Sequence, residues 1–404
     1  MKKVLPALML LTLFSCLTEE SADPGEAATF LRYYNGGFDD QPFAFEETPD
    51  KGFIILASTQ ITDNNVDLQP SKIKLIKVDQ FGNTLWQTLY PAFNETDPVI
   101  NSFYFKGRGL IVEKDPNGTV TGYTIAGDRI EISTKTSHLY VMQTDAEGNF
   151  IRGNSHPLPN VEGQAIVKDN SGYLILGSRI NDMEDMVITR VSGSNLNFDW
   201  TKEYGEGGSS FITGLVTDSQ NNIFWGGTVS RNNGPTAMRL VKTAPGETGT
   251  IFDLDFGLAN SNEKTGGICY SDFGPYFAFI GTTDELGSDD ILYKKISVSG
   301  DVQLTKIIGD ETLPEEGNAI CTTGDGGLLI IGTSGLDEAR DYYMIKLNHL
   351  GDVLWSRIFG SKKPDKGVSV KQASDGSYVI LGSTTLGGLN SIMLMKTDSQ
   401  GNIK

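Results

Sequence analysis

Residues 317–360 read GNAICTTGDGGLLIIGTSGLDEARDYYMIKLNHLGDVLWSRIFG. The segment contains four short runs of apolar, β-branched and aromatic residues, separated by turn sequences. Asp325-Gly326 stands between the first two runs, and Leu350-Gly351-Asp352 stands between the last two. Such residues supply the positive φ angles that tight hairpins need. Short apolar runs bounded by turns form strands rather than helices, so the segment predicts a four-stranded antiparallel unit.

The same unit recurs along the chain, for example at residues 52–90, 163–205 and 366–402. A small residue ends the most apolar run of each copy, at Ala57, Gly127, Gly177, Gly227, Gly281, Gly332 and Gly382. A basic residue, replaced once by glutamine, follows at Lys77, Gln143, Arg190, Lys242, Lys295, Lys346 and Lys396. Seven copies about 50 residues apart are therefore expected, with one insertion in the second copy.

The second run of each copy has no polar alternation, which indicates a strand covered on both faces by stacked sheets. The glycine that ends it would allow close approach of the neighbouring sheet. The last copy stops at Gly401-Asn402-Ile403-Lys404, where a fourth strand should begin. Phe30–Gly37 resembles Leu354–Gly360, the fourth run of the copy before, so the N-terminal strand is expected to complete the last sheet.

The fold prediction is all-β: residues 29–404 form a single seven-bladed β-propeller of four-stranded antiparallel blades, with the last blade closed by the N-terminal strand. Closure into a ring protects the sheet edges. An open solenoid is the alternative. The repeats resemble those of Bacteroidota surface lipoproteins, with a consensus like DGGYIIxGST…LIKLDxxGNxLWxKxYGG. That resemblance specifies the fold and leaves the function open.

Residues 1–16 read MKKVLPALMLLTLFSC. Two lysines precede an apolar run too short to span a bilayer, and Leu13-Phe14-Ser15-Cys16 resembles a bacterial lipobox. The resemblance implies a signal peptide at 1–15, a lipidated Cys16 and a flexible tether at 16–28. The following Glu19-Glu20 resembles an export signal of Bacteroidota surface lipoproteins, which implies an outer-membrane protein exposed at the cell surface. An ordinary cleaved signal with an accidental cysteine is the alternative.

The formal net charge of −18 disfavours binding to phosphate backbones, so no nucleic-acid partner is expected. Acidic residues concentrate in the connections between second and third strands and between blades, which share one face, the long-loop face. They include Asp39, Asp40, Asp182, Glu184, Asp185, Asp284 and Glu285. They predict a face for cations or basic partners, or a merely solvated rim. Calcium is possible but has no motif, and no metal site or cofactor is predicted.

Aromatic residues gather around the insertion of the second copy, at Phe93, Phe103, Tyr104 and Phe105. Rings beside acidic and amide side chains are typical of a sugar-stacking platform. The alternative is that they cap the core or form an extra strand. Trp86, Trp200 and Trp355 occupy equivalent fourth runs. They resemble the tryptophan-docking repeats of quinoprotein propellers, which implies that they lock neighbouring blades together.

Catalytic motifs are absent from the sequence, which contains no HExxH, P-loop or CxxC, and its three histidines are scattered. Cys269 and Cys321 occupy equivalent positions in adjacent copies; free buried thiols are favoured over a disulfide.

These features favour a monomeric, lipid-anchored cell-envelope protein that binds a glycan or an envelope protein through its long-loop face. The alternatives are a glycoside hydrolase or polysaccharide lyase acting on that face, and an outer-membrane assembly factor. An enzyme would need at least two carboxylates near the axis in a pocket flanked by aromatic rings. A binding module would present a flatter rim with exposed rings.

Overall fold

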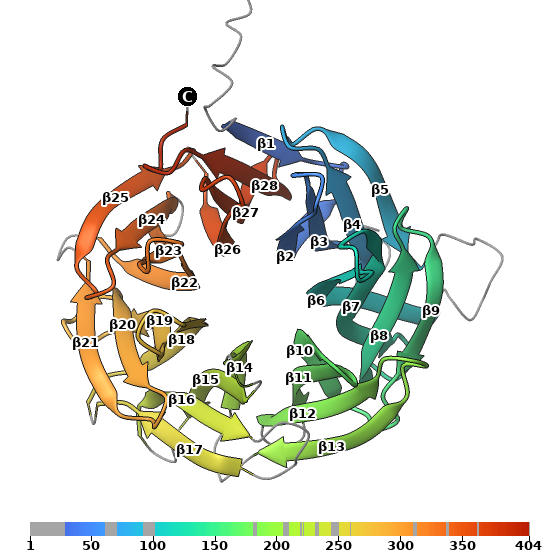
Figure 1. Ribbon diagram of the computed structural model, residues 1–404, viewed down its shortest axis with the longest axis horizontal. Helices are drawn as coiled ribbons and strands as arrows, with labels where there is room; N and C mark the ends of the chain where they lie inside the picture. Colours follow the sequence, from blue (N-terminus) through green and yellow to red (C-terminus); the bar gives the residue numbers. More distant parts are fainter. Residues whose placement is uncertain are drawn as a thin grey trace, which may run out of the picture.

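The computed structural model describes residues 29–60, 71–91, 102–180, 184–204, 210–218, 220, 222–230, 234–243, 250–258, 260–309, 313–336, 339–361 and 363–403. Within these residues the chain forms seven four-stranded antiparallel sheets arranged as a ring (Figure 1). The first strand of each sheet lies nearest the axis of the ring and the fourth lies outermost. The predicted seven-bladed propeller is therefore confirmed.

The first three blades follow the chain in order. Blade 1 comprises β2 (Asp39–Glu47), β3 (Phe53–Gln60), β4 (Ser71–Val78) and β5 (Thr84–Tyr90). Blade 2 comprises β6 (Phe103–Lys114), β7 (Val120–Glu131), β8 (Ser137–Asp145) and β9 (Phe150–Ser155). Blade 3 comprises β10 (Val161–Asp169), β11 (Gly172–Ile180), β12 (Glu184–Ser192) and β13 (Phe198–Tyr204).

The remaining blades continue the pattern until the last one, which takes its fourth strand from the start of the chain. Blade 4 comprises β14 (Ser210–Thr217), β15 (Ile223–Ser230), β16 (Thr236–Thr243) and β17 (Thr250–Phe256). Blade 5 comprises β18 (Glu263–Ser271), β19 (Tyr276–Thr283), β20 (Asp290–Ser297) and β21 (Val302–Ile308). Blade 6 comprises β22 (Glu315–Thr322), β23 (Leu328–Ser334), β24 (Asp341–Leu347) and β25 (Val353–Phe359). Blade 7 comprises β26 (Asp365–Gln372), β27 (Tyr378–Leu386), β28 (Leu389–Thr397) and β1 (Phe30–Tyr34).

Closure of the ring depends on β1, which pairs antiparallel with β28 from Phe30 opposite Lys396 to Tyr34 opposite Ile392. The two strands lie side by side near the C-terminus (Figure 1). Phe30 is buried, and its ring packs edge-on against Phe53 of blade 1 with 6.4 Å between ring centroids. The N-terminal strand thus completes blade 7 as expected and also contributes to the core between blades 7 and 1.

A one-residue β-bulge interrupts the first strand of every blade. The unpaired residues are Phe43, Arg108, Gln164, Thr213, Gly266, Asn318 and Val368. A Cβ placed on Gly177 would lie only 1.9 Å from the carbonyl oxygen of Glu162, two residues before the bulge of the same blade. The expected explanation of the recurrent glycine was therefore incomplete, because at Gly177 the closest group belongs to its own blade. The neighbouring blade also approaches closely, since a Cβ on Gly382 would lie 2.5 Å from the Tyr342 ring of blade 6 and one on Gly281 would lie 2.5 Å from Met238 of blade 4.

The recurrent basic residue of the third strand ties that strand to the turn between the first two strands. Four blades show the same ion pair, with N···O distances of 2.8 Å for Lys77–Asp50, 2.6 Å for Arg190–Asp169, 3.0 Å for Lys346–Asp325 and 2.7 Å for Lys396–Asp375. The cations are buried, whereas the aspartates lie in the turn or, for Asp169, at the strand end that enters it. The repeat position is therefore a structural one.

A large side chain on each of three outermost strands covers a turn glycine of the next blade. A Cβ on Gly148 would lie 2.8 Å from the Trp86 ring, and one on Gly401 would lie 2.7 Å from the Trp355 ring. Phe30 makes the same contact, at 2.7 Å from a Cβ on Gly82. The blade-locking role expected of Trp86 and Trp355 is confirmed. Phe30 pairs with Lys396 in the same way as Trp355 pairs with Lys346, so Phe30 is the structural equivalent of Trp355. The sequence comparison had aligned Phe30 with Leu354, one residue earlier.

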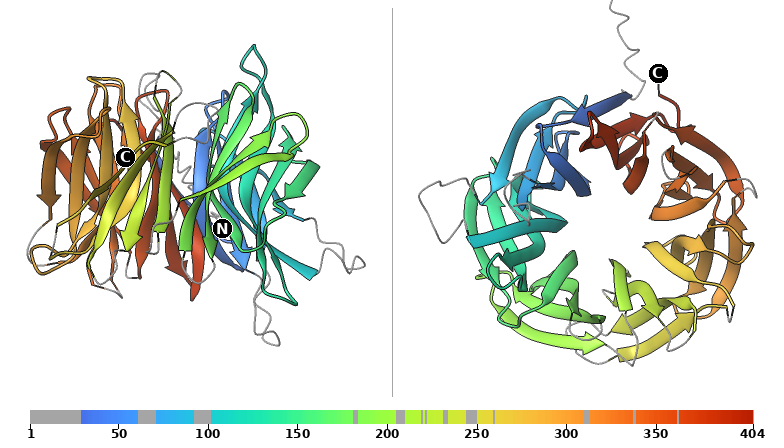
Figure 2. Two further views of the ribbon diagram at one scale, coloured as in Figure 1. Left: turned by 90° about the horizontal axis from the view of Figure 1, so that it is seen from below. Right: turned by 180° about the vertical axis from the view of Figure 1, so that it is seen from behind.

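The two faces of the ring carry different connections (Figure 2). The turns between first and second strands and between third and fourth strands lie on one face, the short-turn face, and the other connections lie on the long-loop face, as expected. Blade 7 departs from this pattern, because only Gly387 and Gly388, with φ angles of 61° and 86°, join β27 to β28. The described residues contain no helix long and apolar enough to cross a membrane.

The two cysteines of the propeller are free thiols. Cys269 belongs to the core between blades 5 and 6, whereas Cys321 packs into the core between blades 6 and 7. They therefore face the two opposite sides of blade 6. Burial raises the pKa of Cys321 to about 12 and also raises that of Cys269, which keeps both groups protonated.

Candidate binding site

A hollow of about 640 Å³ opens on the long-loop face, bordered by blades 6, 7, 1 and 2. First strands from all four blades reach it, which places it beside the axis of the ring. Its hydroxyl and amide lining includes Gln41, Ser58, Thr59, Gln60, Ser71, Thr333, Ser383, Thr385 and Asn390. Its charged lining is Asp39, Asp40, Lys106, Glu316, Arg340, Asp365 and Lys366. The hollow also spans the boundary between blades 7 and 1, called the seam here.

Asp39 and Asp40, both predicted site residues, stand at the start of β2 and line this hollow. Asp40 is fully buried and accepts a hydrogen bond from Lys74, with 2.7 Å between Nζ and Oδ2. Asp39 accepts a hydrogen bond from the backbone N–H of Asn390 at 2.8 Å, which joins blade 1 to blade 7 across the seam. One carboxylate is therefore neutralised and the other fixes the seam.

Two further carboxyl groups line the side of the hollow formed by blades 6 and 7. Glu316 pairs with Arg340, with 2.7 Å between Oε1 and Nη1. Asp365 is buried and accepts a hydrogen bond from the backbone N–H of Ser361 at 2.8 Å. Burial raises the pKa of Asp365, and the nearby Asp341 carboxylate raises it further. Asp365 therefore holds a proton at higher pH than an ordinary aspartate.

Phe103, Tyr104 and Phe105 begin β6 rather than standing in a loop insertion. Because side chains alternate along a strand, Tyr104 lines the hollow, whereas Phe103 and Phe105 line a separate recess of about 480 Å³. Tyr104 is 5% and Phe105 is 7% exposed. The predicted aromatic cluster is thus divided between two sites, and Phe105 packs edge-on against Tyr140 with 5.1 Å between ring centroids.

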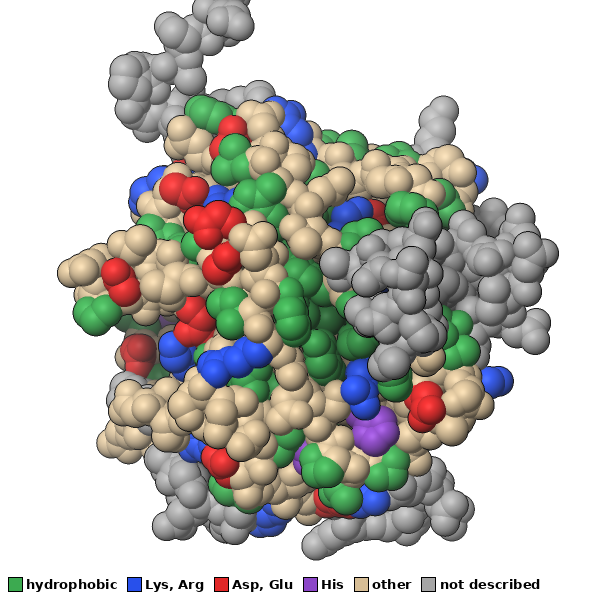
Figure 3. Space-filling model, turned by 90° about the vertical axis from the view of Figure 1, so that its right-hand side faces the viewer, with side chains coloured by type: hydrophobic (Ala, Val, Ile, Leu, Met, Phe, Trp, Pro, Cys, Tyr) green, Lys and Arg blue, Asp and Glu red, His purple; other side chains and the backbone are tan. Residues whose placement is uncertain are grey.

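The recess that holds Phe103 also contains Arg129, whose guanidinium lies 4.4 Å from the centroid of the Phe103 ring. The surface on this side of the molecule shows apolar side chains set back between polar ones (Figure 3). Phe103, Phe105 and Tyr140 also belong to the core between blades 1 and 2. Phe103 and Phe105 therefore cap a core, which was the alternative to a sugar-stacking platform.

The other predicted acidic residues do not line the hollow. Glu184 and Asp185 begin β12. Asp284 accepts hydrogen bonds from the backbone N–H and the side-chain amide of Asn262, at 2.6 Å and 2.8 Å, and so fixes a connection at the long-loop edge of blade 5. Glu285 follows in the same exposed turn. Cys16, Phe93 and Asp182 lie outside the described residues.

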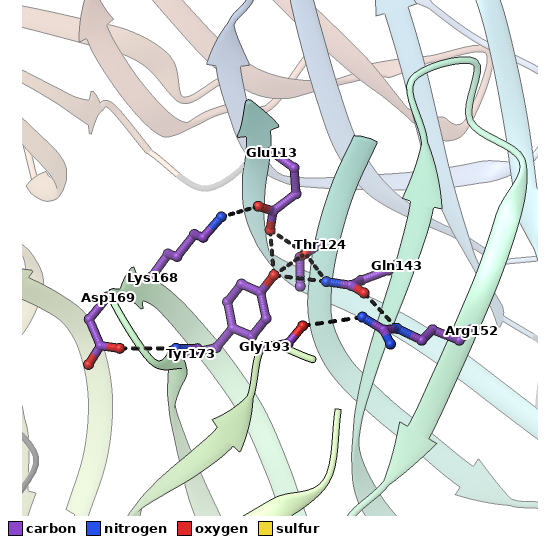
Figure 4. A network of polar contacts seen from close by, with 9 residues as sticks. Glu113, Thr124, Gln143, Arg152, Lys168, Asp169, Tyr173 and Gly193 are labelled. Atoms are coloured by element: carbon purple, nitrogen blue, oxygen red, sulfur yellow. Dashed lines mark hydrogen bonds and ion pairs between the residues drawn. The ribbon is translucent and has the colours of Figure 1, made fainter. Parts of the chain in front are cut away.

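A second polar network lies on the short-turn side of blades 2 and 3, around the one copy with glutamine at the basic position (Figure 4). Gln143 donates to the Tyr173 hydroxyl at 2.8 Å and accepts from Arg152 Nε at 2.7 Å. Tyr173 donates to Glu113 at 2.6 Å, and Glu113 also pairs with Lys168. Because these groups satisfy one another across the blade boundary, the network joins blades 2 and 3.

Sequence reasoning missed the charged lining contributed by Lys106, Arg340, Asp365 and Lys366. Lys106 and Lys366 occupy one repeat position, directly before the first-strand glycine, and a comparison of the copies at that position could have revealed them. Among the described residues, no group of three or more His, Cys, Asp or Glu side chains is arranged to hold a metal ion.

No protein-family model matches the chain, and no curated protein matches its sequence. Several solved structures resemble its fold. A protein of unknown function from Dyadobacter fermentans aligns with 93% of this chain and 99% of its own, with a TM-score of 0.51 and 11% identity. The polysaccharide lyase Uly1 aligns over 95% and 94%, with a TM-score of 0.52 and 11% identity. Puromycin hydrolase aligns over 90% of this chain but 53% of its own, with a TM-score of 0.53 and 11% identity. These likenesses show the propeller fold alone.

Proposed function

We propose that the protein is a lipid-anchored cell-envelope propeller that binds a glycan in the hollow on its long-loop face. The observation that carries the proposal is the lining of that hollow, where hydroxyl, amide and charged side chains from four blades converge. Sugars present many hydroxyl groups, each of which can both donate and accept hydrogen bonds with such side chains. A protein partner would instead need a broad patch with an apolar centre, whereas few apolar side chains reach this hollow.

Internal contacts support a preorganised site. The Lys74–Asp40 and Arg340–Glu316 ion pairs fix two walls, and the Asn390–Asp39 hydrogen bond fixes the wall at the seam. Side chains held in this way lose little conformational freedom when a ligand binds, which favours affinity.

The proposed location rests on Cys16 and the segment before it. A diacylated cysteine with an acylated amine would hold the propeller at a membrane surface through its tether. The test is metabolic labelling with a fatty acid and fractionation of the native host, with Cys16→Ser beside the wild type. Loss of label and release from the membrane fraction are expected for Cys16→Ser; an unlabelled wild type would refute the anchor.

A glycan array probed with the full chain tests the binding proposal. Gln41 is exposed and lines the hollow, so Gln41→Ala should weaken binding. Gln400 is exposed in a turn of the short-turn face, so Gln400→Ala is the matched control and should bind as the wild type does. Equal binding by Gln41→Ala and wild type, or binding of no glycan at all, would contradict the proposal.

Catalysis in the same hollow is the second candidate, because the four carboxyl groups near the axis meet part of the requirement for an enzyme. Lys74 and Arg340 neutralise two of the four, which leaves Asp365, with its raised pKa, as the best proton donor. Product release from a bound glycan that disappears in Asp365→Asn would establish a hydrolase or lyase. Binding without any product would establish the binding module.

A further inference from the structure

One repeat position forms a ring of side chains around the axis on the long-loop face. It lies two residues before the bulge of each first strand and is called the mouth ring here. Its members with described side chains are Gln41, Lys106, Glu162, Lys264, Glu316 and Lys366. Half of these six residues are lysines, although the whole chain carries a formal charge of −18.

The acidic members of the mouth ring are paired with arginines. Glu316 lies 2.7 Å from Nη1 of Arg340, and Glu162 lies 3.4 Å from Nη2 of Arg108. Arg108 also pairs with the buried Asp128, with 3.1 Å between Nε and Oδ2, and burial raises the pKa of that carboxyl group. The lysines are different, because no described carboxylate lies within ion-pairing distance of any of the three. Lys264 and Lys366 are exposed, and Lys106 is half-buried. The unpaired charge of the mouth ring is therefore positive.

The remaining acids of the hollow do not cancel this charge. Asp40 is paired with Lys74, and Asp365 is buried and accepts a hydrogen bond from the backbone N–H of Ser361. Asp39 has no ion-pair partner in the wall of the hollow, but it already accepts a hydrogen bond from the backbone N–H of Asn390. Lys264 has acidic neighbours, because Asp289 lines the same small hollow and Lys264 helps to lower the pKa of Asp284. The unopposed positive charge is therefore concentrated at Lys106 and Lys366.

The three lysines reach connected surfaces. Lys106 and Lys366 line the hollow from the two blades that flank blade 1. Lys264 lines a smaller hollow of about 190 Å³, and Glu316 belongs to the lining of both. A chain-like ligand in the larger hollow could therefore extend along the mouth to Lys264.

We infer that the ligand of this face is an acidic glycan, a sugar chain whose carboxylate or sulfate groups bind Lys106, Lys366 and Lys264. The inference rests on the proposed function and names its ligand class. Ammonium groups bind carboxylate and sulfate oxygens through charge-assisted hydrogen bonds. The hydroxyl and amide side chains of the hollow bind the sugar hydroxyls between the acidic groups.

The test compares four probes by calorimetry with the full chain: polygalacturonate, chondroitin sulfate, dextran and inorganic polyphosphate. Binding of the two acidic glycans, weakened by added salt, is expected, with weaker binding of dextran and polyphosphate. Lys106→Met and Lys366→Met should each weaken binding about 3- to 10-fold, and the double variant more. Lys114→Met is the matched control, because Lys114 is exposed at the opposite end of β6, on the short-turn face.

The outcomes separate the inference from the function on which it rests. Tight binding of dextran without the acidic glycans would overturn the inference and leave glycan binding standing. Equal effects of Lys106→Met and Lys114→Met would overturn the assignment to the mouth ring. Polyphosphate bound as tightly as the glycans would show that charge alone is recognised, which would also overturn the inference. Binding of none of the probes or array glycans would remove the proposed function itself.

Discussion

Replacing Gly177 by alanine tests whether the first-strand bulge shapes each blade. The new Cβ would lie 1.9 Å from the carbonyl oxygen of Glu162 and 3.0 Å from its carbonyl carbon, both backbone atoms that no rotamer change can move. In an unstrained strand, Gly→Ala stabilises by about 0.4–1 kcal/mol through the unfolded state. Overpacking against rigid backbone instead destabilises by about 1–3 kcal/mol. We expect the clash to win and the free energy of unfolding to fall by about 2 kcal/mol or more.

Urea unfolding followed by tryptophan fluorescence measures this effect, with two controls. A Cβ on the exposed turn residue Gly324 would meet only the Gln372 side chain at 3.5 Å, an ordinary contact, so Gly324→Ala should leave the midpoint unchanged or raise it. Ala57 already carries a methyl group at the equivalent position of blade 1, so Ala57→Gly should lose about 0.5–1 kcal/mol.

A milder variant keeps the reasoning testable if Gly177→Ala does not fold. At Gly332 the equivalent oxygen, that of Glu316, lies 2.3 Å from the added Cβ, so Gly332→Ala should be less damaging than Gly177→Ala. A Gly177→Ala protein as stable as the wild type, with an unchanged slope against urea, would refute the explanation of the recurrent glycine.

Two other predictions concern ring closure and the turn ion pairs. Phe30→Ala should lower the free energy of unfolding by about 3 kcal/mol, because Phe30 is 5% exposed in the core between blades 7 and 1. Leu31→Ala, at a residue 37% exposed in the same strand, should change it little, and equal thermal shifts for the two variants would argue against closure through β1. Partial burial raises the pKa of Asp325, but hydrogen bonds from Thr323, Gly327 and Lys346 outweigh burial and lower it to about 2. The stability gained from this depressed pKa is fully present above about pH 4 and is lost as the pH falls toward 2. Because the carboxylate is partly exposed to solvent, this contribution to the free energy of unfolding is about 1 kcal/mol. Asp325→Asn should therefore be less stable than wild type at pH 7, with a smaller further loss between pH 4 and pH 2, and identical pH profiles would contradict the assignment.

The repeat pattern was sufficient to predict the architecture. The strands and turns of each copy can be predicted from that copy alone, and the contacts between neighbouring copies differ little around the ring. The same local rules applied to seven copies therefore predict the complete propeller. The N-terminal strand was also recognisable, because Phe30–Gly37 resembles a fourth strand. The predicted alignment of this strand was wrong by one residue. The contact that fixes the alignment joins Phe30 to Gly82 of blade 1, and the sequence of the strand does not show it.

The candidate site was much less predictable from sequence. Tyr104 and Phe105 are neighbours in sequence, yet their side chains lie on opposite faces of the strand and line different sites. From the sequence, their segment was interpreted as part of an insertion, whereas it begins β6. Asp284 belonged to the predicted acidic rim, yet it fixes its own connection away from the hollow.

The sequence by itself determined the number of blades, the strands within each and the partner of the N-terminal strand, because these depend on local periodicity and turn chemistry repeated along the chain. Only the tertiary structure decided which charges remain unpaired at the mouth, because that depends on distances between side chains from different strands and blades, such as Arg108 with Glu162 and Lys74 with Asp40. No spacing within one repeat encodes those distances, which arise only when the ring closes.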